Sequence, residues 1–116
     1  MRVIVTGGRY FTDEALLFEF LDVVKQKFNL TEICHGAASG ADTLAGKWAE
    51  LRGVSVKQFP ALWEKYGRSA GPRRNLQMLQ EFKPDLLVAF PGGKGTRDMI
   101  EKARNAKIQI LFAPTP

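Results

Sequence analysis

Five short apolar runs alternate with longer stretches of helical periodicity, and this alternation limits the folds open to the chain of 116 residues. Continuous apolar runs of this length are typical of strands buried on both faces of a parallel sheet. Each run is far shorter than the roughly 18 apolar residues that a membrane span needs, so we expect no membrane partner. The predicted strands cover residues 2–7, 32–36, 54–59, 85–90 and 108–113.

Between the apolar runs, hydrophobic residues recur at the three- and four-residue spacing of a helix that buries one face. The predicted helices cover residues 13–28, 40–51, 71–82 and 96–106. Two of the predicted buried stripes are Leu44, Trp48 and Leu51 in the second helix and Leu76, Leu79 and Phe82 in the third. Strands and helices that alternate with short connections imply parallel strands joined by right-handed crossovers. We therefore expect one three-layer α/β domain over residues 1–116.

Glycine follows three of the predicted strands where each strand turns into a helix. The junctions are TGGRYFTD after the first strand, HGAASGAD after the second and FPGGKGTRD after the fourth. In an open parallel sheet, ligands bind beyond the carboxyl ends of the strands, where the strand order reverses. With the order 3-2-1-4-5, all three junctions meet at the switch between the first and fourth strands. Bare backbone and helix N-termini at one point predict a phosphate or anion site.

Standard nucleotide and metal motifs are missing from the sequence. There is no G-x-x-x-x-G-K-[ST], which argues against a P-loop ATPase. The first junction has Gly7 and Gly8 but not G-x-G-x-x-G, and no acidic residue closes the second strand, which argues against ordinary NAD-dependent hydride transfer. The single His35 and the adjacent Cys34 make no zinc site. We predict no required metal or cofactor and leave open a Mg²⁺ ion held by ligand phosphates.

Cations gather near the glycine junctions. The net charge is +5, which suits nucleic acid or free nucleotides without choosing between them. The cations in or beside the junctions are Arg9, Arg68, Arg73, Arg74, Lys94 and Arg97. Arg73 and Arg74 are adjacent in the first turn of a predicted helix, where positive charge opposes the helix dipole. A bound anion would offset that cost.

Several polar residues at the junctions have two interpretations. Asp42 completes an S-x-x-D capping box with Ser39, or it contacts a ligand. Asp13 complements a helix N-terminus or accepts from a ligand hydroxyl. Thr96 is expected to be a helix N-cap whose hydroxyl or backbone N–H also reaches a phosphate. His35 is a hydrogen-bonded structural residue or a catalytic one.

The segment PALWEKYGRSA, residues 60–70, has no clear period. A connection this long in so small a domain is more often functional than idle. Trp63 and Tyr66 either stack on a ligand ring or cover the edge of the core. Cys34 is the only cysteine, so no internal disulfide can form, and we expect a buried thiol in a cytoplasmic protein.

Four segments together resemble the SLOG superfamily of Rossmann-like nucleotide-binding domains. They are GGR…D, HGAASGAD, AGPRRNLQM and PDLLVAFPGGKGTRDM, and they span nearly the whole chain. The closest branch is the small YspA, cpYpsA-related family. The resemblance implies a five-stranded Rossmann-like fold, a nucleotide or nucleotide-derived ligand, and a homo-oligomer. No established reaction comes with that branch.

The chain is also similar to two more distant groups of the superfamily. One is the Lonely-guy phosphoribohydrolases, with the signature R-K-x-x-M followed by P-G-G-x-G-T-x-x-E. The corresponding residues are Arg74, Asn75, Met78, Pro91, Gly92, Gly93, Gly95 and Thr96, with Asn75 in place of the signature lysine. The signature glutamate falls on Met99, and Asp98 lies one position earlier. The other group is the DNA-processing protein A family, which handles single-stranded DNA.

We therefore predict that the chain binds a nucleotide or nucleotide-derived molecule in a pocket at the glycine-rich loops and acts as a sensor or ligand-processing domain. The phosphate is expected on the backbone of Gly92, Gly93, Gly95 and Thr96. Its charge is expected to be neutralised by Arg74, Arg9 and Arg73. The sugar side is expected to be lined by Gly7, Gly8, Gly36 and Asp42, with Asp42 or Asp13 accepting from ribose hydroxyls. Asn75 and Pro91 complete the predicted ligand-binding set.

Two alternative functions stay open at this point. The first is a phosphoribohydrolase-like enzyme that cleaves a nucleoside monophosphate, with Asp98 and Arg74 as catalytic residues and Asp42 as the alternative acid–base group. A carboxylate is the group that would stabilise a developing oxocarbenium ion or activate water. The second is single-stranded nucleic-acid binding. Such binders usually combine an extended basic groove with several exposed aromatic residues, whereas the cations here cluster around one predicted pocket.

Overall fold

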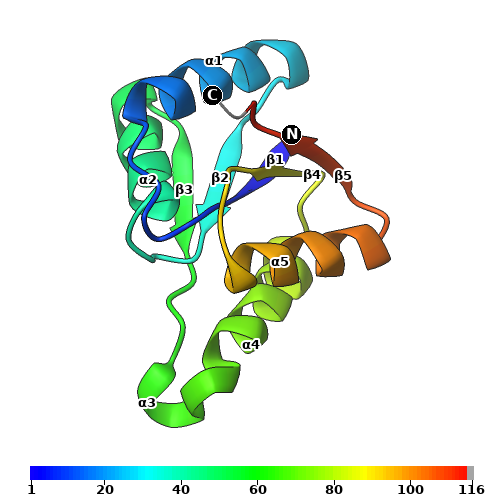
Figure 1. The fold of residues 1–116 in the computed structure, drawn as a ribbon. Helices are drawn as coiled ribbons and strands as arrows, with labels where there is room; N and C mark the ends of the chain where they lie inside the picture. The colour runs from blue at the N-terminus through cyan, green and yellow to red at the C-terminus, as the bar shows by residue number, and fades with distance from the viewer. Residues whose placement is uncertain (115–116) are drawn as a thin grey trace.

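Five parallel strands form one sheet in the order β3-β2-β1-β4-β5 in the computed structural model of the protein, which describes residues 1–114 (Figure 1). The strands are β1 (Arg2–Thr6), β2 (Glu32–His35), β3 (Ser55–Gln58), β4 (Leu86–Ala89) and β5 (Gln109–Phe112). Each neighbouring pair is parallel. The predicted sheet and its strand order are confirmed. The predicted domain runs to residue 116, and residues 115–116 lie outside the described part.

Helices cover both faces of the sheet and divide the core into two clusters (Figure 1). The helical segments are α1 (Glu14–Phe28), α2 (Ala41–Arg52), α3 (Trp63–Tyr66), η1 (Gly67–Ser69), α4 (Ala70–Gln77), the π-helical turn η2 (Met78–Phe82) and α5 (Lys94–Asn105). Val3 and Val5 of β1 pack with α1 and α2, whereas Ile4 packs with η2 and α5. Alternate residues of a strand point to opposite faces, so β1 serves both clusters. Cys34 is buried in the second cluster, as expected.

Two predicted buried stripes are partly wrong. In α2 the buried face runs through Ala41, Ala45 and Ala49 beside the fully buried Trp48, so Leu51 falls outside it and is 60% exposed.

In α4 and η2 the buried face runs through Gly71, Asn75 and Met78. Leu76 lies one residue, or about 100° of rotation, away from that face and is 44% exposed. The predicted single helix also changes at Met78 into the wider π-helical turn. Phe82 of the same predicted stripe is buried.

The chain leaves the sheet between β3 and α4 as an arm, residues 60–69, which contains α3 and η1 (Figure 1). None of the arm's residues is buried. Two of its large apolar side chains, Leu62 and Trp63, are 53% and 46% exposed. The arm is therefore held to the body by few apolar contacts, and its side chains are available to whatever lies beside it.

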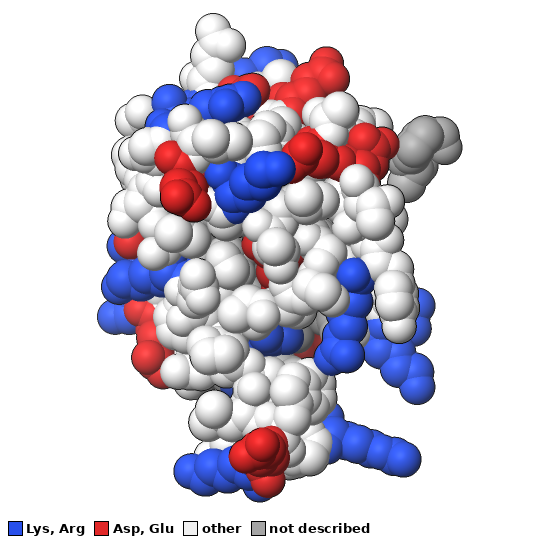
Figure 2. Space-filling view, turned by 90° about the vertical axis from the view of Figure 1, so that its left-hand side faces the viewer, with Lys and Arg blue, Asp and Glu red and all other residues white. Residues whose placement is uncertain are grey.

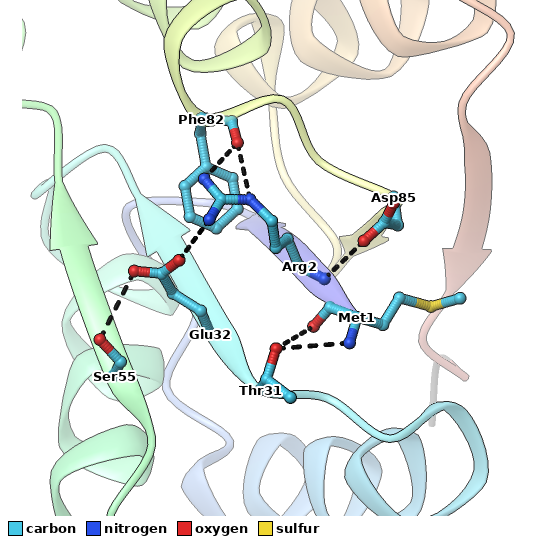
Figure 3. A network of polar contacts seen from close by, with 7 residues as sticks. All are labelled: Met1, Arg2, Thr31, Glu32, Ser55, Phe82 and Asp85. Carbon is cyan, nitrogen blue, oxygen red and sulfur yellow. Dashed lines mark hydrogen bonds and ion pairs between the residues drawn. The ribbon is translucent and has the colours of Figure 1, made fainter.

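Arg2 fastens the amino ends of the strands, at the edge of the sheet opposite the glycine junctions (Figure 3). Its Nη1 donates to Glu32 Oε1 of β2 at 2.7 Å, and its Nε donates to the carbonyl of Phe82 at 2.9 Å. The guanidinium also lies 4.2 Å from the centre of the Phe82 ring. The Arg2 backbone N–H donates to Asp85 Oδ2 at 2.8 Å. These contacts satisfy the Phe82 carbonyl at the end of η2 and tie it to β1 and β2. The loops that follow the strands lie at the other edge of the sheet.

Candidate functional site: a cavity at the carboxyl edge of the sheet

A cavity of about 920 Å³ lies where the predicted site should be, beyond the carboxyl ends of the strands. Its volume is within the range of small-molecule sites. The lining comes from residues in the segments 5–13, 36–42, 63–78 and 91–98. Of the predicted ligand-binding and catalytic residues, all except Arg73 line it. The topology therefore brings together residues from four separate parts of the sequence, and their roles toward a ligand stay predictions.

The loops after β1, β2 and β4 are joined backbone to backbone. The Gly8 N–H donates to the Pro91 carbonyl at 2.8 Å, and the Gly8 carbonyl accepts from the Ala41 N–H at 3.1 Å. A Cβ atom on Gly92 would lie 2.7 Å from the Gly8 nitrogen, and one on Gly8 would lie 2.9 Å from the Pro91 carbonyl oxygen. Both distances are too short for a side chain. Gly8 and Gly92 are thus required by the packing of the loops themselves.

Gly93 and Gly95 are different, because no neighbouring protein atom requires glycine at their positions. A Cβ atom on either would meet no protein atom within 4 Å. Neither has a positive φ. Both are exposed and line the cavity. Bare backbone at this place leaves room for a ligand to approach closely.

The N-terminus of α5 points into the same region. The helix begins at Lys94 with Gly93 as N-cap, and no side chain within the described residues caps it. The prediction of Thr96 as N-cap is wrong, because the turn after Pro91 enters the helix two residues earlier and makes Thr96 its third residue. Thr96 is buried and its hydroxyl lies beside Gly92. The first N–H groups of α5 and the positive end of its dipole are therefore available to an anion.

Arg74 ties α4 to the ends of two strands. Its Nη1 donates to the Gly36 carbonyl at 2.5 Å and, at 3.4 Å, to the carbonyl of Phe59. Its Nε donates to Asn75 Oδ1 at 3.0 Å. Burial lowers the pKa of the guanidinium, and the nearby Asp42 acts against that shift. Arg74 lines the cavity as a charge whose position is fixed by backbone carbonyls, a role that the sequence does not reveal.

The two other predicted arginines make contacts of their own. Arg9 lines the cavity and lies 5.2 Å from the centre of the Trp63 ring. Arg73 lies 4.4 Å from the centre of the Tyr66 ring and donates from Nε to Ser69 Oγ at 3.0 Å. It lines a separate, smaller cavity of about 270 Å³, so the structure does not bring it to the large cavity. The reason is its place on α4, where it points toward the arm.

Charges of both signs line the large cavity. The cations are Arg9, Arg68, Arg74 and Lys94, and the acidic residues are Asp13, Asp42 and Asp98. On the face drawn in Figure 2, Lys and Arg are interspersed with Asp and Glu and form no continuous basic band over the described residues. The excess positive charge of the chain is therefore not gathered into one long groove on that face.

Asp42 holds the loop between β2 and α2. Its Oδ2 accepts from the backbone N–H of Gly36 at 3.1 Å and of Ala38 at 3.2 Å. The predicted capping box is not formed, because Ser39 donates its hydroxyl to the Arg9 carbonyl and α2 has Gly40 as N-cap. Burial raises the pKa of Asp42 to about 6, although both N–H groups and Arg74 favour the ionised form.

Asp13 lies at the start of α1. It is the N-cap of the helix, and its side chain accepts from the Leu16 N–H at 3.1 Å. The interpretation of Asp13 as a helix N-terminal residue is confirmed. It also lines the cavity.

Asp98 faces the cavity, whereas Met99 faces the core. Asp98 Oδ2 accepts from Asn75 Nδ2 at 2.9 Å, and its Oδ1 accepts from Lys102 Nζ at 2.6 Å. The buried Asn75 also donates to the Gly95 carbonyl at 3.2 Å, so it links α4 to the first turn of α5. Met99 has no exposed surface and packs in the second cluster. The position of the signature glutamate is thus apolar and closed, and the carboxylate at the cavity comes from the preceding residue.

His35 is buried and does not line the cavity. Its Nδ1 accepts from the Ala37 N–H at 2.9 Å, so the proton of the neutral ring is on Nε2, which has no partner within the described residues. Burial, together with the Arg74 charge, lowers the pKa of His35. Of the two interpretations, the structure favours the structural one.

Over residues 1–114, no three or more His, Cys, Asp and Glu side chains are grouped so as to hold a metal ion. No helix of that part of the chain combines the length and apolar character needed to cross a membrane.

The fold and the position of the cavity define a Rossmann-like α/β domain whose open side lies at the strand switch. The chain belongs to the YspA, cpYpsA-related SLOG family, whose model matches residues 1–66. It is 33% identical to the Gene 61 protein of Mycobacterium phage D29 in an alignment 119 positions long that covers 95% of this chain and 94% of that protein.

A solved structure supports the fold. It is UDP-GlcNAc 2-epimerase from Neisseria meningitidis bound to UDP-GlcNAc, with a TM-score of 0.63 and 15% identity. The match covers 97% of this chain and 31% of the epimerase chain, so this chain spans about a third of that protein. At this level of identity the likeness supports the Rossmann-like architecture alone.

The two kinds of glycine predict opposite effects on stability. Gly92→Ala should lower the free energy of unfolding by about 1–3 kcal/mol, because the new methyl group forces apart two loops. Gly95→Ala should leave it unchanged or raise it by up to about 1 kcal/mol, because alanine favours a helix and meets open space. Urea unfolding of both variants measures this difference. Equal destabilisation would contradict the assignment of Gly92 to packing and of Gly95 to free space.

Proposed function

We propose that the protein binds a nucleotide or a nucleotide-derived molecule in the large cavity, with its phosphate on the N-terminus of α5. Membership of the SLOG family supports a nucleotide-related role in general terms. The observation that carries the finer proposal is the open backbone of Gly93 and Gly95 at an uncapped helix N-terminus within the described chain. Backbone N–H groups and a helix dipole aimed at one point are a common way of binding phosphate.

Cations at the cavity support the same assignment. Lys94 is exposed in the first turn of α5, and Arg68 is exposed on the arm. Both are free to move toward a phosphate, whereas Arg74 contributes a charge from a fixed position. Asp42 and Asp13 are the groups that would accept hydrogen bonds from ribose hydroxyls. A Mg²⁺ ion, where the ligand brings one, would be held by the ligand phosphates.

A thermal-shift panel of AMP, ADP, ATP, NAD, ADP-ribose and a short single-stranded oligonucleotide tests the proposal. A ligand at 100 times its Kd adds about 2.7 kcal/mol to the free energy of unfolding, which raises the Tm of a domain of this size by several degrees. We expect such a shift with at least one of the free nucleotides. Gly95→Ala should reduce the affinity for that nucleotide about tenfold or more, because the methyl group occupies the path of the phosphate.

Two results of the panel would contradict the proposal. A shift with the oligonucleotide alone, falling steeply as salt is added, would instead support single-stranded nucleic-acid binding. No shift with any free nucleotide would remove the proposed ligand class. Self-association, which the family resemblance implies, stays a prediction that the same samples test by light scattering.

A second candidate function is hydrolysis of a nucleoside monophosphate. The observation that favours it is the Asp98 carboxylate at the cavity, on the first turns of the helix that would hold the phosphate. Against it, both oxygens of Asp98 already accept hydrogen bonds, one from Lys102 and one from Asn75. These hydrogen bonds occupy lone pairs that a base would use to accept a proton from water.

Incubation with AMP, followed by chromatography for free adenine and ribose 5-phosphate, tests the second function. Release of both products by the protein, and its loss in Asp98→Asn, would support a hydrolase. Absence of adenine under conditions where AMP raises the Tm would show binding without cleavage. On the geometry of Asp98 and Met99, we expect binding without cleavage.

A further inference from the structure

Trp63 is the large aromatic side chain that the fold leaves half-exposed beside the cavity. It is 46% exposed, lies at the start of α3 on the arm, and lines the cavity. Exposed indole is costly in water, and the arm has no buried residue to compensate for it. An apolar ring bound in the cavity would cover the indole and give the arm the packing that it lacks.

The indole is held in place although it is exposed. Gly71 of α4 lies against the edge of the ring, and a Cβ atom there would be 3.3 Å from its Cη2 atom. The Arg9 guanidinium lies 5.2 Å from the ring centre on the side of the first loop. These two contacts restrict the indole, so it loses less freedom when a second ring stacks on it than a side chain without neighbours would.

The other aromatic side chains near the arm are less suited to this role. Tyr66 lines the smaller cavity and not the large one. Tyr10 also lines the large cavity, but it is 93% exposed, so few protein contacts fix its ring. Trp48 is fully buried and donates from Nε1 to Asp22.

We propose that Trp63 is the stacking platform for the aromatic base of the ligand. The inference rests on the proposed function and narrows it. The ligand is then a nucleotide that carries a purine or pyrimidine, rather than a sugar phosphate or an inorganic phosphate. Its phosphate lies on the first turn of α5 at Gly93 and Gly95, and its base lies against the arm.

Tryptophan fluorescence tests the proposal directly, because the chain has two tryptophans and Trp48 is sealed in the core. AMP and ADP-ribose are titrated with excitation at the red edge of indole absorption, where adenine does not absorb. Ribose 5-phosphate is the matched ligand without a base. We expect saturable quenching by AMP or ADP-ribose and none by ribose 5-phosphate, which should also bind at least about fivefold more weakly.

Three variants separate stacking from general effects on the arm. Trp63→Ala should weaken the binding of AMP or ADP-ribose about 5- to 150-fold and leave that of ribose 5-phosphate unchanged. Trp63→Phe, which keeps an aromatic face, should recover most of the loss. Leu62→Ala removes an exposed apolar side chain from the same arm, facing the smaller cavity, and should change neither affinity.

The failures of the two proposals are distinguishable. If AMP or ADP-ribose raises the Tm but leaves Trp63 fluorescence and the affinity of Trp63→Ala unchanged, the stacking platform is wrong and the nucleotide site stands. Equal affinity for AMP and ribose 5-phosphate would likewise overturn the stacking platform and leave the nucleotide site in place. If no free nucleotide of the panel binds in any measurement while the oligonucleotide quenches Trp63, both proposals fall.

Discussion

The close approach of three backbone loops at the carboxyl edge of the sheet is the constraint on which the rest of the site depends. The loop after β1 lies between the loops after β2 and β4, with the Gly8 N–H donating to Pro91 and the Gly8 carbonyl accepting from Ala41. Side chains at Gly8 or Gly92 would break this contact. Gly93 and Gly95 are not needed for packing in this way, and their open backbone is where we propose that the phosphate binds.

Much of the fold follows from the sequence. Continuous β-branched and apolar runs predict buried parallel strands, and the alternation with helices leaves few topologies, so the strand order could be predicted. The buried faces of the helices were harder to predict. Leu51 and Leu76 fit an apolar period, but each lies beside the buried face, which is formed by small residues in α2 and includes Asn75 in α4. When a helix carries one stripe of alanines and another of leucines, the apolar period alone does not say which of the two stripes packs against the sheet.

Which residues line the cavity was also predictable, apart from Arg73, since glycine junctions at the carboxyl ends of the strands must converge in an open parallel sheet. The role of each residue in the cavity was harder to predict. Arg74 is anchored by the carbonyls of Gly36 and Phe59, which are far from it in sequence. Thr96 lies inside α5 instead of capping it, and Arg73 turns toward the arm. Such roles depend on contacts between distant segments, which no local pattern encodes.

The central claim is that a phosphate binds at the N-terminus of α5, and amide chemical shifts test it most directly. A ¹⁵N-resolved NMR titration with ADP-ribose should move the amide signals of Gly93, Lys94, Gly95 and Thr96 most strongly. The amides around Arg2 and Phe82, at the opposite edge of the sheet, should stay in place. Saturable shifts that spare residues 93–96 and cluster elsewhere would contradict the account.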